Sequence, residues 1–343
     1  MAAPVLEVRN LGKVFSRGVF KKEEVVALDD FSMQIDPAHP TITAIAGESG
    51  SGKTTLALLL LGLLTPSSGQ ILYQGQDTTG FSASGGTEFR REVQAIFQDP
   101  FEVFNPFYRI DHVLETVVKN FRLAKGKQDG DRLIRETLSS LGLQPDAVLG
   151  RFPHQLSGGQ RQRIMIARAI LPNPKVIIAD EPVSMVDASL RALILDNMLH
   201  LKRDLGISFL YITHDLSTAY QISDDIFVLY LGGVAEHGDV ARVIENPHHP
   251  YTKLLVESVP IPDPAAGWGD KVALPPEDEI RLAAKVGCRF ARRCPQVMEI
   301  CRTAPPPLYE VAPDQYAACF LYRDRPVKAD TGNRRALPVV ARA

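Results

Sequence analysis

The segment from Gly47 to Thr54, which reads GESGSGKT, carries residue types that bind phosphate groups. It fits the pattern GxxxxGK[ST], in which backbone N–H groups surround the phosphates, the lysine reaches the β and γ phosphates, and the hydroxyl binds Mg²⁺. The apolar run 41–46 precedes the segment and an apolar stretch with helical spacing follows it. This order predicts a strand, a phosphate-binding loop and a helix, and therefore a nucleotide site.

Two adjacent carboxylates, Asp180 and Glu181, follow the apolar run 176–179. Such a run ending in Asp-Glu is commonly just a strand that meets solvent. Beside a phosphate-binding loop, however, it predicts a buried strand that delivers Asp180 to Mg²⁺ and holds Glu181 where it can polarise water.

The segment 156–160, LSGGQ, resembles the signature of the ATP-binding cassette (ABC) ATPases. Read from the residues alone, Ser157 followed by two glycines is a helix N-cap, and the exposed N–H groups and helix dipole at such a start bind anions. The resemblance implies that the anion is the γ-phosphate of ATP bound to an opposite subunit. The signature residues that would serve that site are Ser157, Gly158, Gly159 and Gln160.

Further positions match the family in the same order along the chain: Gln98, Asp187 and His214. The resemblance implies that Gln98 senses the γ-phosphate and helps to bind Mg²⁺, that Asp187 belongs to a loop packed across a cassette dimer, and that His214 contacts the γ-phosphate. It also implies that Glu181 is the base or water-orienting group. The catalytic set is then Glu181, His214 and Gln98.

The resemblance also implies an ATP-binding set and a Mg²⁺-binding set. Phe15 stands where the family places an aromatic residue under the adenine, although a packed core phenylalanine is the equal alternative. The expected ATP-binding residues are Gly47, Glu48, Ser49, Gly50, Ser51, Gly52, Lys53, Thr54, Thr55 and Phe15. The expected Mg²⁺ ligands are Thr54, Gln98 and Asp180.

Residues 246–255 resemble the C-terminal hallmark of the oligopeptide/dipeptide importer branch of the family. The adjacent His248 and His249 in this segment are better explained by a turn entering a helix than by a metal site. Prolines and glycines between 260 and 276 predict a boundary. Beyond it we expect a small cysteine-containing unit.

All four cysteines lie in that unit: Cys288, Cys294, Cys301 and Cys319. Their spacing fits neither a zinc ribbon nor a ferredoxin run. Four thiols are the full ligand count of a cluster, and the resemblance implies a [4Fe-4S] cluster; tetrahedral Zn²⁺ and four free thiols are the alternatives. Nearby arginines are expected to lower the pKa values of the thiols, namely Arg289, Arg292, Arg293 and Arg302.

The elements that must position these groups alternate between strands and helices. Strands are expected over 5–9, 41–46, 176–179, 208–213 and 226–230, a helix over 189–205, and amphipathic helices between 105 and 151. This alternation predicts a parallel α/β fold. The resemblance implies a P-loop ABC ATPase cassette with a RecA-like core over 1–258, including a helical subdomain over about 105–170, then a cysteine-containing C-terminal extension over 259–328 and a tail over 329–343.

Composition bounds the function. The 343 residues carry a formal net charge of -2, with 45% hydrophobic and 23% charged residues, which excludes a disordered or fibrous chain and a strongly basic nucleic-acid binder. The longest apolar run, 56–64, is too short to span a bilayer, and no secretory signal is visible. The cysteines are therefore not expected to form disulfides.

The main hypothesis is the ATP-hydrolysing motor of a membrane importer for peptides or oligosaccharide-like solutes. It would act at the cytoplasmic face of the inner membrane, paired with a second cassette, on two transmembrane permease subunits served by an extracytoplasmic solute-binding protein. The alternative, a soluble ABC ATPase acting on nucleic acid or ribosomes, is disfavoured because the stretch from Thr54 to Leu156 is too short for a long coiled coil and only one cassette is present. A degenerate, non-hydrolysing subunit is disfavoured because Glu181 and His214 are intact.

Four aromatic residues beside two prolines form a final feature: Phe101, Phe104, Phe107 and Tyr108. Such a group is costly in water unless something covers it. It predicts a site for a cytoplasmic helix of a permease subunit, and the alternative is an ordinary packed loop.

Overall fold

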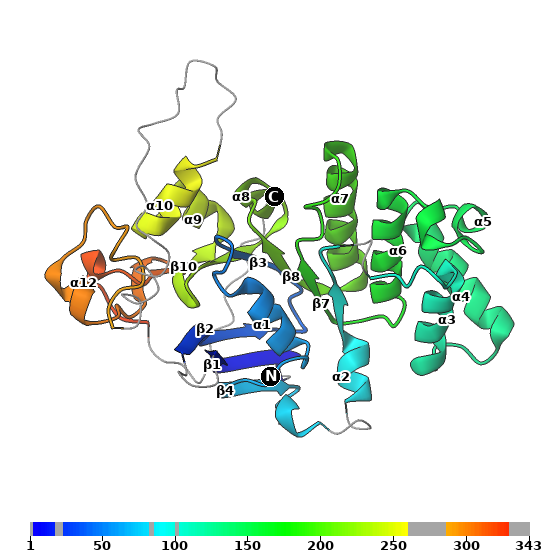
Figure 1. The fold of residues 1–343 in the computed structure, drawn as a ribbon, viewed down its shortest axis with the longest axis horizontal. Coiled ribbons are helices and arrows are strands. Elements are labelled where there is room, and N and C mark those ends of the chain that lie inside the picture. Colours follow the sequence, from blue (N-terminus) through cyan, green and yellow to red (C-terminus); the bar gives the residue numbers. More distant parts are fainter. Residues whose placement is uncertain (1–2, 18–22, 82–85, 100–102, 260–285, 329–343) are drawn as a thin grey trace, which may run out of the picture.

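The computed structural model describes residues 3–17, 23–81, 86–99, 103–259 and 286–328, which form two β-sheets and the helices that cover them (Figure 1). The larger sheet has eight strands in the order β11-β12-β10-β9-β3-β8-β7-β6. The smaller sheet has four strands in the order β2-β1-β4-β5. The expected proline-rich boundary over 260–276 and the expected tail over 329–343 lie outside the described residues.

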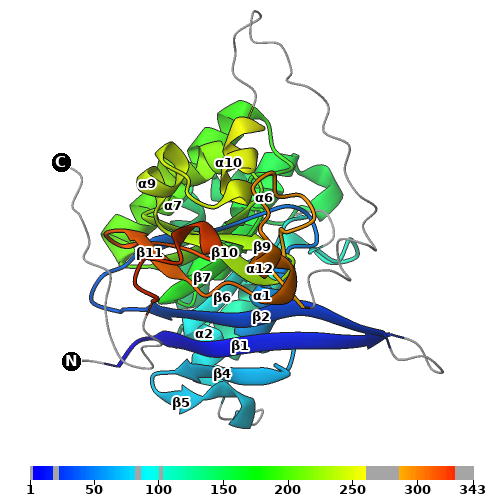
Figure 2. The ribbon, with the colours of Figure 1, turned by 90° about the vertical axis from the view of Figure 1, so that its left-hand side faces the viewer.

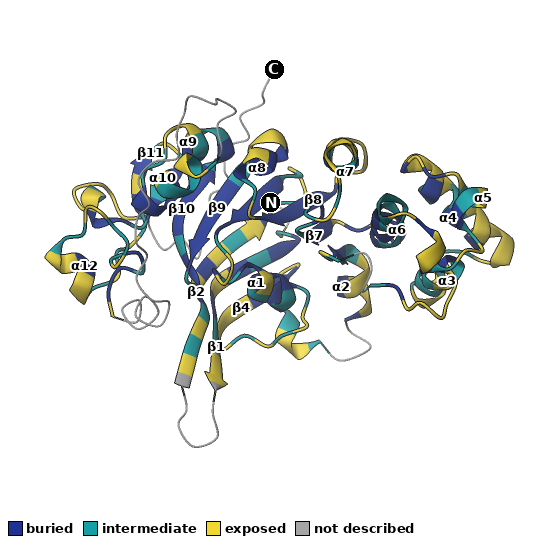
Figure 3. Ribbon diagram, turned by 45° about the horizontal axis from the view of Figure 1, so that its top comes forward, coloured by how far each residue is buried: buried dark blue, intermediate teal, exposed yellow. Residues whose placement is uncertain are grey.

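Five consecutive strands of the larger sheet, from β9 to the edge strand β6, are parallel, and the predicted parallel α/β fold is confirmed. They are β3 (Ile42–Ala46), β6 (Val93–Ile96), β7 (Val176–Asp180), β8 (Ser208–Thr213) and β9 (Asp225–Tyr230). Their residues are buried almost without interruption, as expected for a parallel sheet covered on both faces (Figure 3).

Successive residues of these strands face two different hydrophobic clusters, because side chains alternate across a sheet. In β3, Ala44 and Ala46 belong to one cluster and Ile45 to the other. The first cluster is completed by helices α6 (Gly158–Ile170), α7 (Ala188–Leu205), α8 (Leu216–Ile222) and α9 (Val240–Glu245). The second cluster is completed by α1 (Lys53–Leu60), α2 (Thr87–Glu92) and the smaller sheet.

The smaller sheet is antiparallel and packs under α1 (Figure 2). It consists of β1 (Leu6–Arg17), β2 (Glu23–Ile35), β4 (Ser68–Tyr73) and β5 (Gln76–Asp77). A 3-10 turn over Thr78–Gly80 follows β5.

A block of helices lies at the far end of the molecule from the cysteine-bearing segment (Figure 1). It contains α3 (Ile110–Asn120), α4 (Lys127–Ser140), α5 (Pro145–Val148) and a 3-10 turn over Pro153–Gln155 that leads into α6. Buried residues such as Leu114 and Leu138 turn the apolar faces of α3 and α4 inward, which confirms the predicted amphipathic helices. None of the helices that the structure describes has both the length and the apolar character needed to cross a membrane.

The chain after β9 extends the larger sheet with antiparallel strands. Strand β10 (Gly233–Asp239) pairs antiparallel with β9 and with β12 (Gln315–Ala317), and β12 pairs with β11 (Tyr309–Ala312). Helices α10 (Pro250–Glu257) and α12 (Glu299–Thr303) and a 3-10 turn over Phe320–Tyr322 complete this end. The cysteine-bearing segment is therefore joined to the core by backbone pairing.

Candidate nucleotide-binding and hydrolysis site

The glycine-rich loop connects β3 to α1, in the predicted order of strand, loop and helix. Gly47 has a φ of 148° and Gly52 a φ of 106°, both in the region that favours glycine. A Cβ atom at Gly47 would collide with the Leu229 carbonyl oxygen, and one at Gly52 with the Ala27 carbonyl oxygen. Both glycines are therefore required by the path of the backbone.

Lys53 is the first residue of α1 and its side chain is buried under the loop. Its Nζ donates hydrogen bonds to the carbonyl oxygens of Gly47, at 2.7 Å, and Glu48, at 2.9 Å. Burial lowers the pKa of Lys53, and the nearby carboxylates of Glu181, Asp180 and Glu48 oppose that shift. The ammonium group of Lys53 is thus held at the loop that is predicted to bind the phosphates.

Asp180 ends β7 next to this loop. Its carboxylate is hydrogen-bonded to the Thr54 side chain, while burial raises the pKa of Asp180. A hydroxyl and a carboxylate side by side are the oxygen ligands that Mg²⁺ uses with nucleotide phosphates. Two of the three expected Mg²⁺ ligands, Thr54 and Asp180, are therefore brought together, and the site fits the ion.

Glu181 holds the centre of a hydrogen-bonded group of three side chains. Its Oε2 accepts from Gln98 Nε2 at 2.9 Å, and its Oε1 lies 3.0 Å from Nδ1 of His214. Its backbone has a φ of 46°, a left-handed conformation that costs about 1 kcal/mol for a residue with a side chain. The backbone N–H of Glu181 donates to the Ile212 carbonyl at 2.9 Å, which fixes this conformation. The three residues predicted to be catalytic thus lie together.

The signature segment begins α6, as the N-cap interpretation predicts. Ser157 Oγ accepts from the Gln160 N–H at 3.2 Å, and Gln160 Oε1 accepts from the Ser157 N–H at 3.0 Å, which is a capping box. A Cβ atom at Gly159 would collide with Cδ2 of Leu190 in α7. Asp187 caps α7 by accepting from the Leu190 N–H at 2.9 Å. The signature and the Asp187 loop therefore pack against each other, on a different part of the fold from the phosphate loop.

Phe15 lies on β1 with 38% of its surface exposed, and it belongs to neither hydrophobic cluster. The ammonium of Lys13 lies 5.2 Å from the centre of its ring. The alternative of a core phenylalanine is therefore wrong. The adenine-binding role stays a prediction.

Two contacts to the phosphate loop were missed by the sequence analysis. Tyr251 of α10 accepts a hydrogen bond from the Glu48 N–H, at 2.9 Å between Oη and N. Arg293 of the cysteine-bearing segment donates to both oxygens of the Glu48 carboxylate, at 2.8 and 2.9 Å. Glu48 and Arg293 are 245 residues apart, so no local pattern signals the pair.

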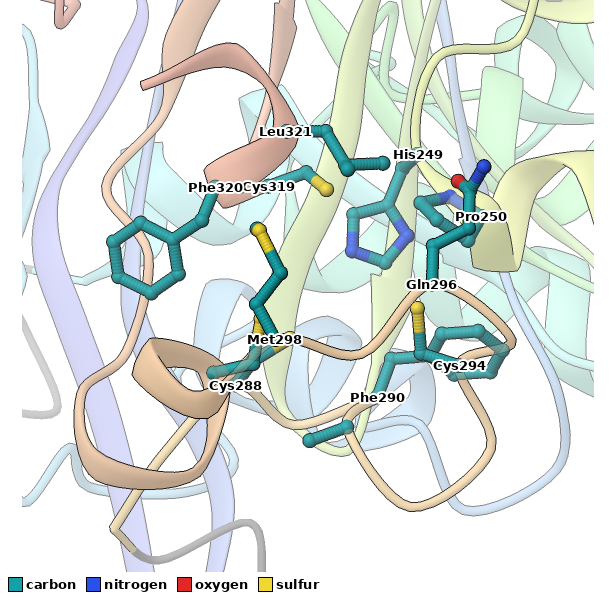
Figure 4. Close-up of a pocket in the computed structure, with 12 residues that line it drawn as sticks. His249, Pro250, Cys288, Phe290, Cys294, Gln296, Met298, Cys319, Phe320 and Leu321 are labelled. Atoms are coloured by element: carbon teal, nitrogen blue, oxygen red, sulfur yellow. The ribbon is translucent and has the colours of Figure 1, made fainter.

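The four cysteines are free and line one small cavity together with His249 (Figure 4). Its volume of about 10 Å³ is roughly the room that one water-sized sphere needs. Within the described residues, no group of three or more histidine, cysteine, aspartate or glutamate side chains is arranged to hold a metal ion. The cysteines converge, but they do not form a finished ligand set.

The predicted effect of the arginines on the thiols is wrong. Burial raises the pKa of Cys288 and Cys294, and it raises that of Cys319 to about 12, with the other thiols adding to the shift. Arg293 forms an ion pair with Glu48, and Arg289 forms one with Asp29. Both guanidinium groups therefore bind carboxylates of the cassette core.

The aromatic cluster after Gln98 is also different from the prediction. Phe104 is 5% exposed and belongs to the core, whereas Phe107 is 86% exposed and Tyr108 is half exposed and stacks on His112. Phe101 lies outside the described residues. The exposed apolar surface is therefore limited, within the described part of this loop, to Phe107 and Tyr108.

Comparisons with known proteins agree with this geometry. Residues 28–184 match the family described as "ABC transporter", and residues 235–301 match the region described as "Oligopeptide/dipeptide transporter, C-terminal region". The "Putative oligopeptide transport ATP-binding protein YkfD" of Bacillus subtilis is 38% identical over 95% of this chain and 98% of its own. The "Oligopeptide transport ATP-binding protein AppF" of Bacillus subtilis is 36% identical over 93% of this chain and 97% of its own.

Solved structures show the same fold. The "ATP-binding cassette MJ0796 bound to ADP and Pi", described as dimeric and in a post-hydrolysis state, matches with a TM-score of 0.61 and 26% identity over 68% of this chain and 98% of that one. The cassette "cbiO1 from clostridium perfringens" matches with a TM-score of 0.60 and 28% identity over 71% of this chain and 92% of that one. These findings favour the transporter over the nucleic-acid alternative. The chain belongs to the ABC transporter family of ATP-hydrolysing cassettes, in the branch with the oligopeptide/dipeptide transporter C-terminal region.

Proposed function

We propose that this ATPase drives the import of peptides, with oligosaccharide-like solutes as the alternative cargo. The matched C-terminal region and the relatives named as oligopeptide transport ATP-binding proteins support a peptide cargo. In this proposal the chain works at the cytoplasmic face of the cell membrane. It acts on two transmembrane permease subunits that receive the solute from an extracytoplasmic binding protein.

The observation that carries the hydrolytic role is the position of the Glu181 carboxylate, held from both sides by Gln98 and His214. A carboxylate fixed in this way orients a water molecule and accepts its proton, while the other two groups keep it aimed. His214 also contacts the γ-phosphate, and Gln98 transmits its presence toward the helical block.

The phosphates of ATP are held by Lys53 and by backbone N–H groups of the loop from Gly47 to Thr55 other than that of Glu48, which donates to Tyr251. Thr54 and Asp180 hold Mg²⁺, joined by Gln98 when nucleotide is bound. Bound Mg²⁺ neutralises charge on the β and γ phosphates. Phe15 stacks under the adenine.

A complete site needs a second cassette. Ser157 and Gly159 begin α6, and the free N–H groups at that helix start, with the helix dipole, attract the γ-phosphate of ATP bound to the partner. Asp187 lies beside them and contacts the partner cassette. The partner is a copy of this chain or a related subunit.

Phe107 and Tyr108 contact the permease. They precede α3 on the helical block and are exposed, and a cytoplasmic helix of a permease subunit is an apolar occupant of fitting chemistry. Phe104 anchors the same loop in the core.

The cysteine cavity is the basis for a second proposed feature, a metal centre. The donor set of Cys288, Cys294, Cys301 and Cys319 suits a [4Fe-4S] cluster or Zn²⁺. The cavity has room for about one water-sized sphere, so the thiols must move apart to take a cluster. A bound cation also favours thiolates over the buried thiols. Anaerobic purification followed by analysis of iron, sulfide and zinc tests this feature. A protein without metal refutes the metal centre. A protein with stoichiometric zinc shows that the centre is a Zn²⁺ site and not a cluster.

Uptake measurements test the proposed cargo. Cells that carry this chain with its permeases are given a labelled tripeptide or a labelled trisaccharide, and wild type is compared with the Glu181→Gln variant. The proposal expects tripeptide uptake that the variant abolishes. Trisaccharide uptake alone supports the alternative cargo, and uptake of both solutes independent of the chain contradicts the proposal.

A further inference from the structure

Arg293 links the cysteine-bearing segment to the phosphate loop by a two-point ion pair. Its Nη1 and Nη2 donate to the two oxygens of Glu48, the second residue of the loop, at 2.8 and 2.9 Å. The Arg293 side chain is 10% exposed. Its guanidinium group lies 5.6 Å from the ring centres of Tyr230 and Phe290. A planar, two-pronged contact packed against two adjoining aromatic rings holds the arginine in one place.

The backbone of the phosphate loop is held by other contacts as well. The Glu48 N–H donates to Tyr251 Oη at 2.9 Å, and the Gly232 N–H donates to the Ser51 carbonyl at 3.0 Å. Because these bonds fix the loop without Arg293, the particular contribution of Arg293 is its positive charge.

That charge matters because Glu48 places a carboxylate in a loop built to bind anions. The carboxylate is close enough to Lys53 to act on its ammonium group. ATP brings several negative charges to the same loop, and an uncompensated carboxylate would repel them, most strongly where water is partly excluded. An arginine paired with that carboxylate cancels the repulsion.

We propose that Arg293 is a positioning residue for nucleotide binding: it neutralises Glu48 and thereby sets the affinity of the phosphate loop for ATP. The inference rests on the proposed ATP site. Its consequence is that a segment outside the cassette core controls how tightly the core binds nucleotide.

Calorimetric titration of the full chain with the non-hydrolysable analogue AMP-PNP tests the proposal. The variants are Arg293→Met, which keeps much of the side-chain bulk and removes the charge, and the double variant Glu48→Gln/Arg293→Met. Arg242→Met is the matched control, because Arg242 Nη1 donates to the Pro313 carbonyl, 2.6 Å away, and so also joins the core to the appended segment.

Arg293→Met should weaken binding about tenfold, with a smaller effect at high salt because the repulsion is screened. The double variant should bind clearly more tightly than Arg293→Met alone, since the repelling carboxylate is gone. Arg242→Met should bind as wild type does. A purely structural role for Arg293 predicts no rescue by Glu48→Gln.

Three results would overturn the proposal. The first is an unchanged affinity for AMP-PNP in Arg293→Met, and the second is an equal loss of affinity in Arg293→Met and Arg242→Met. The third is a double variant that binds as weakly as Arg293→Met. Lys53→Ala separates this result from a failure of the ATP site itself. If that variant bound as tightly as wild type, the ATP site would be misassigned. If Arg293→Met is unstable, Arg293→Lys, which keeps the charge, should bind within about threefold of wild type, and a tenfold loss there contradicts charge neutralisation.

Discussion

The imidazole of His214 lies 3.0 Å from the carboxylate of Glu181, between Nδ1 and Oε1. The two residues follow different strands, β7 and β8, which are hydrogen-bonded neighbours in the parallel sheet. Because the carboxyl ends of parallel strands meet at one edge, residues far apart in the sequence converge there. Glu181 adopts a left-handed backbone at this point, so the strand end is shaped to aim its side chain.

His214→Ala should lower the rate of ATP hydrolysis about a hundredfold, since it removes the side chain bonded to Glu181 and, in the proposed mechanism, a contact to the γ-phosphate. Binding of ATP should stay within about threefold, because Lys53 and the loop remain. Steady-state ATPase assays and nucleotide titrations measure the two effects separately. A variant that loses affinity but not rate would show that His214 serves binding only.

Phe104 and Phe107 should respond in opposite ways to replacement by serine. Phe104→Ser opens a cavity in the core and should lower the free energy of unfolding by about 3 kcal/mol. Phe107→Ser should leave stability unchanged and reduce the solute transported per ATP hydrolysed. Urea denaturation measures the stability of both variants, and a transport assay measures the solute transported per ATP. Normal coupling of transport to hydrolysis in Phe107→Ser would contradict the proposed permease contact.

Ser157→Asp should abolish hydrolysis in the assembled transporter, yet leave nucleotide binding by the isolated chain within about twofold. Aspartate still caps α6, so the helix is kept, but in the proposed dimer its charge would repel the γ-phosphate bound to the partner cassette. Ser157→Asn is the neutral, cap-competent control. Loss of binding in the isolated Ser157→Asp chain would mean that the signature serves its own chain's site.

Asp225 should make stability fall as the pH rises. Burial and the nearby carboxylates of Asp224, Asp239 and Asp314 raise the pKa of Asp225 from 3.8 to about 7, and Lys202 opposes the shift. Between those values the folded state holds a proton that the unfolded state has released, so raising the pH costs stability, by about 4 kcal/mol in all once pH exceeds 7. Asp225→Asn should therefore be more stable than wild type at pH 8 and equal to it near pH 4. If the difference in the free energy of unfolding between the two proteins did not change with pH, the raised pKa of Asp225 would be refuted.

Sequence patterns predicted the parallel core well. Buried apolar runs such as 176–179 and 208–213 appear as β7 and β8, because a strand covered on both faces needs uninterrupted apolar residues. Glu181 and His214 follow β7 and β8, so the neighbouring positions of these two strands are enough to bring the two motif residues together. The helix expected over 189–205 is α7, which begins one residue earlier, at Ala188, directly after its Asp187 cap.

The appended segment was less predictable because its structure depends on distant pairing. Strand β12 has three residues, and its partner Glu236 in β10 is far away in the sequence. The prediction that the arginines lower the pKa values of the thiols failed for the same reason. Closeness in sequence does not determine which way a side chain points, and the Arg293 side chain binds Glu48, although Cys294 is its neighbour in the chain. The positions of Phe104 and Phe107, three residues apart, likewise follow from the fold of the loop and not from composition.

The central claim, that Glu181 activates water in this ATPase, is tested most directly by the Glu181→Gln variant in the partner-bound transporter. Glutamine keeps the shape of the side chain but cannot accept the proton. The account predicts ATP binding within about threefold of wild type and hydrolysis reduced at least about a hundredfold, whereas Lys53→Ala should weaken binding itself. Hydrolysis by Glu181→Gln at the wild-type rate would contradict the account.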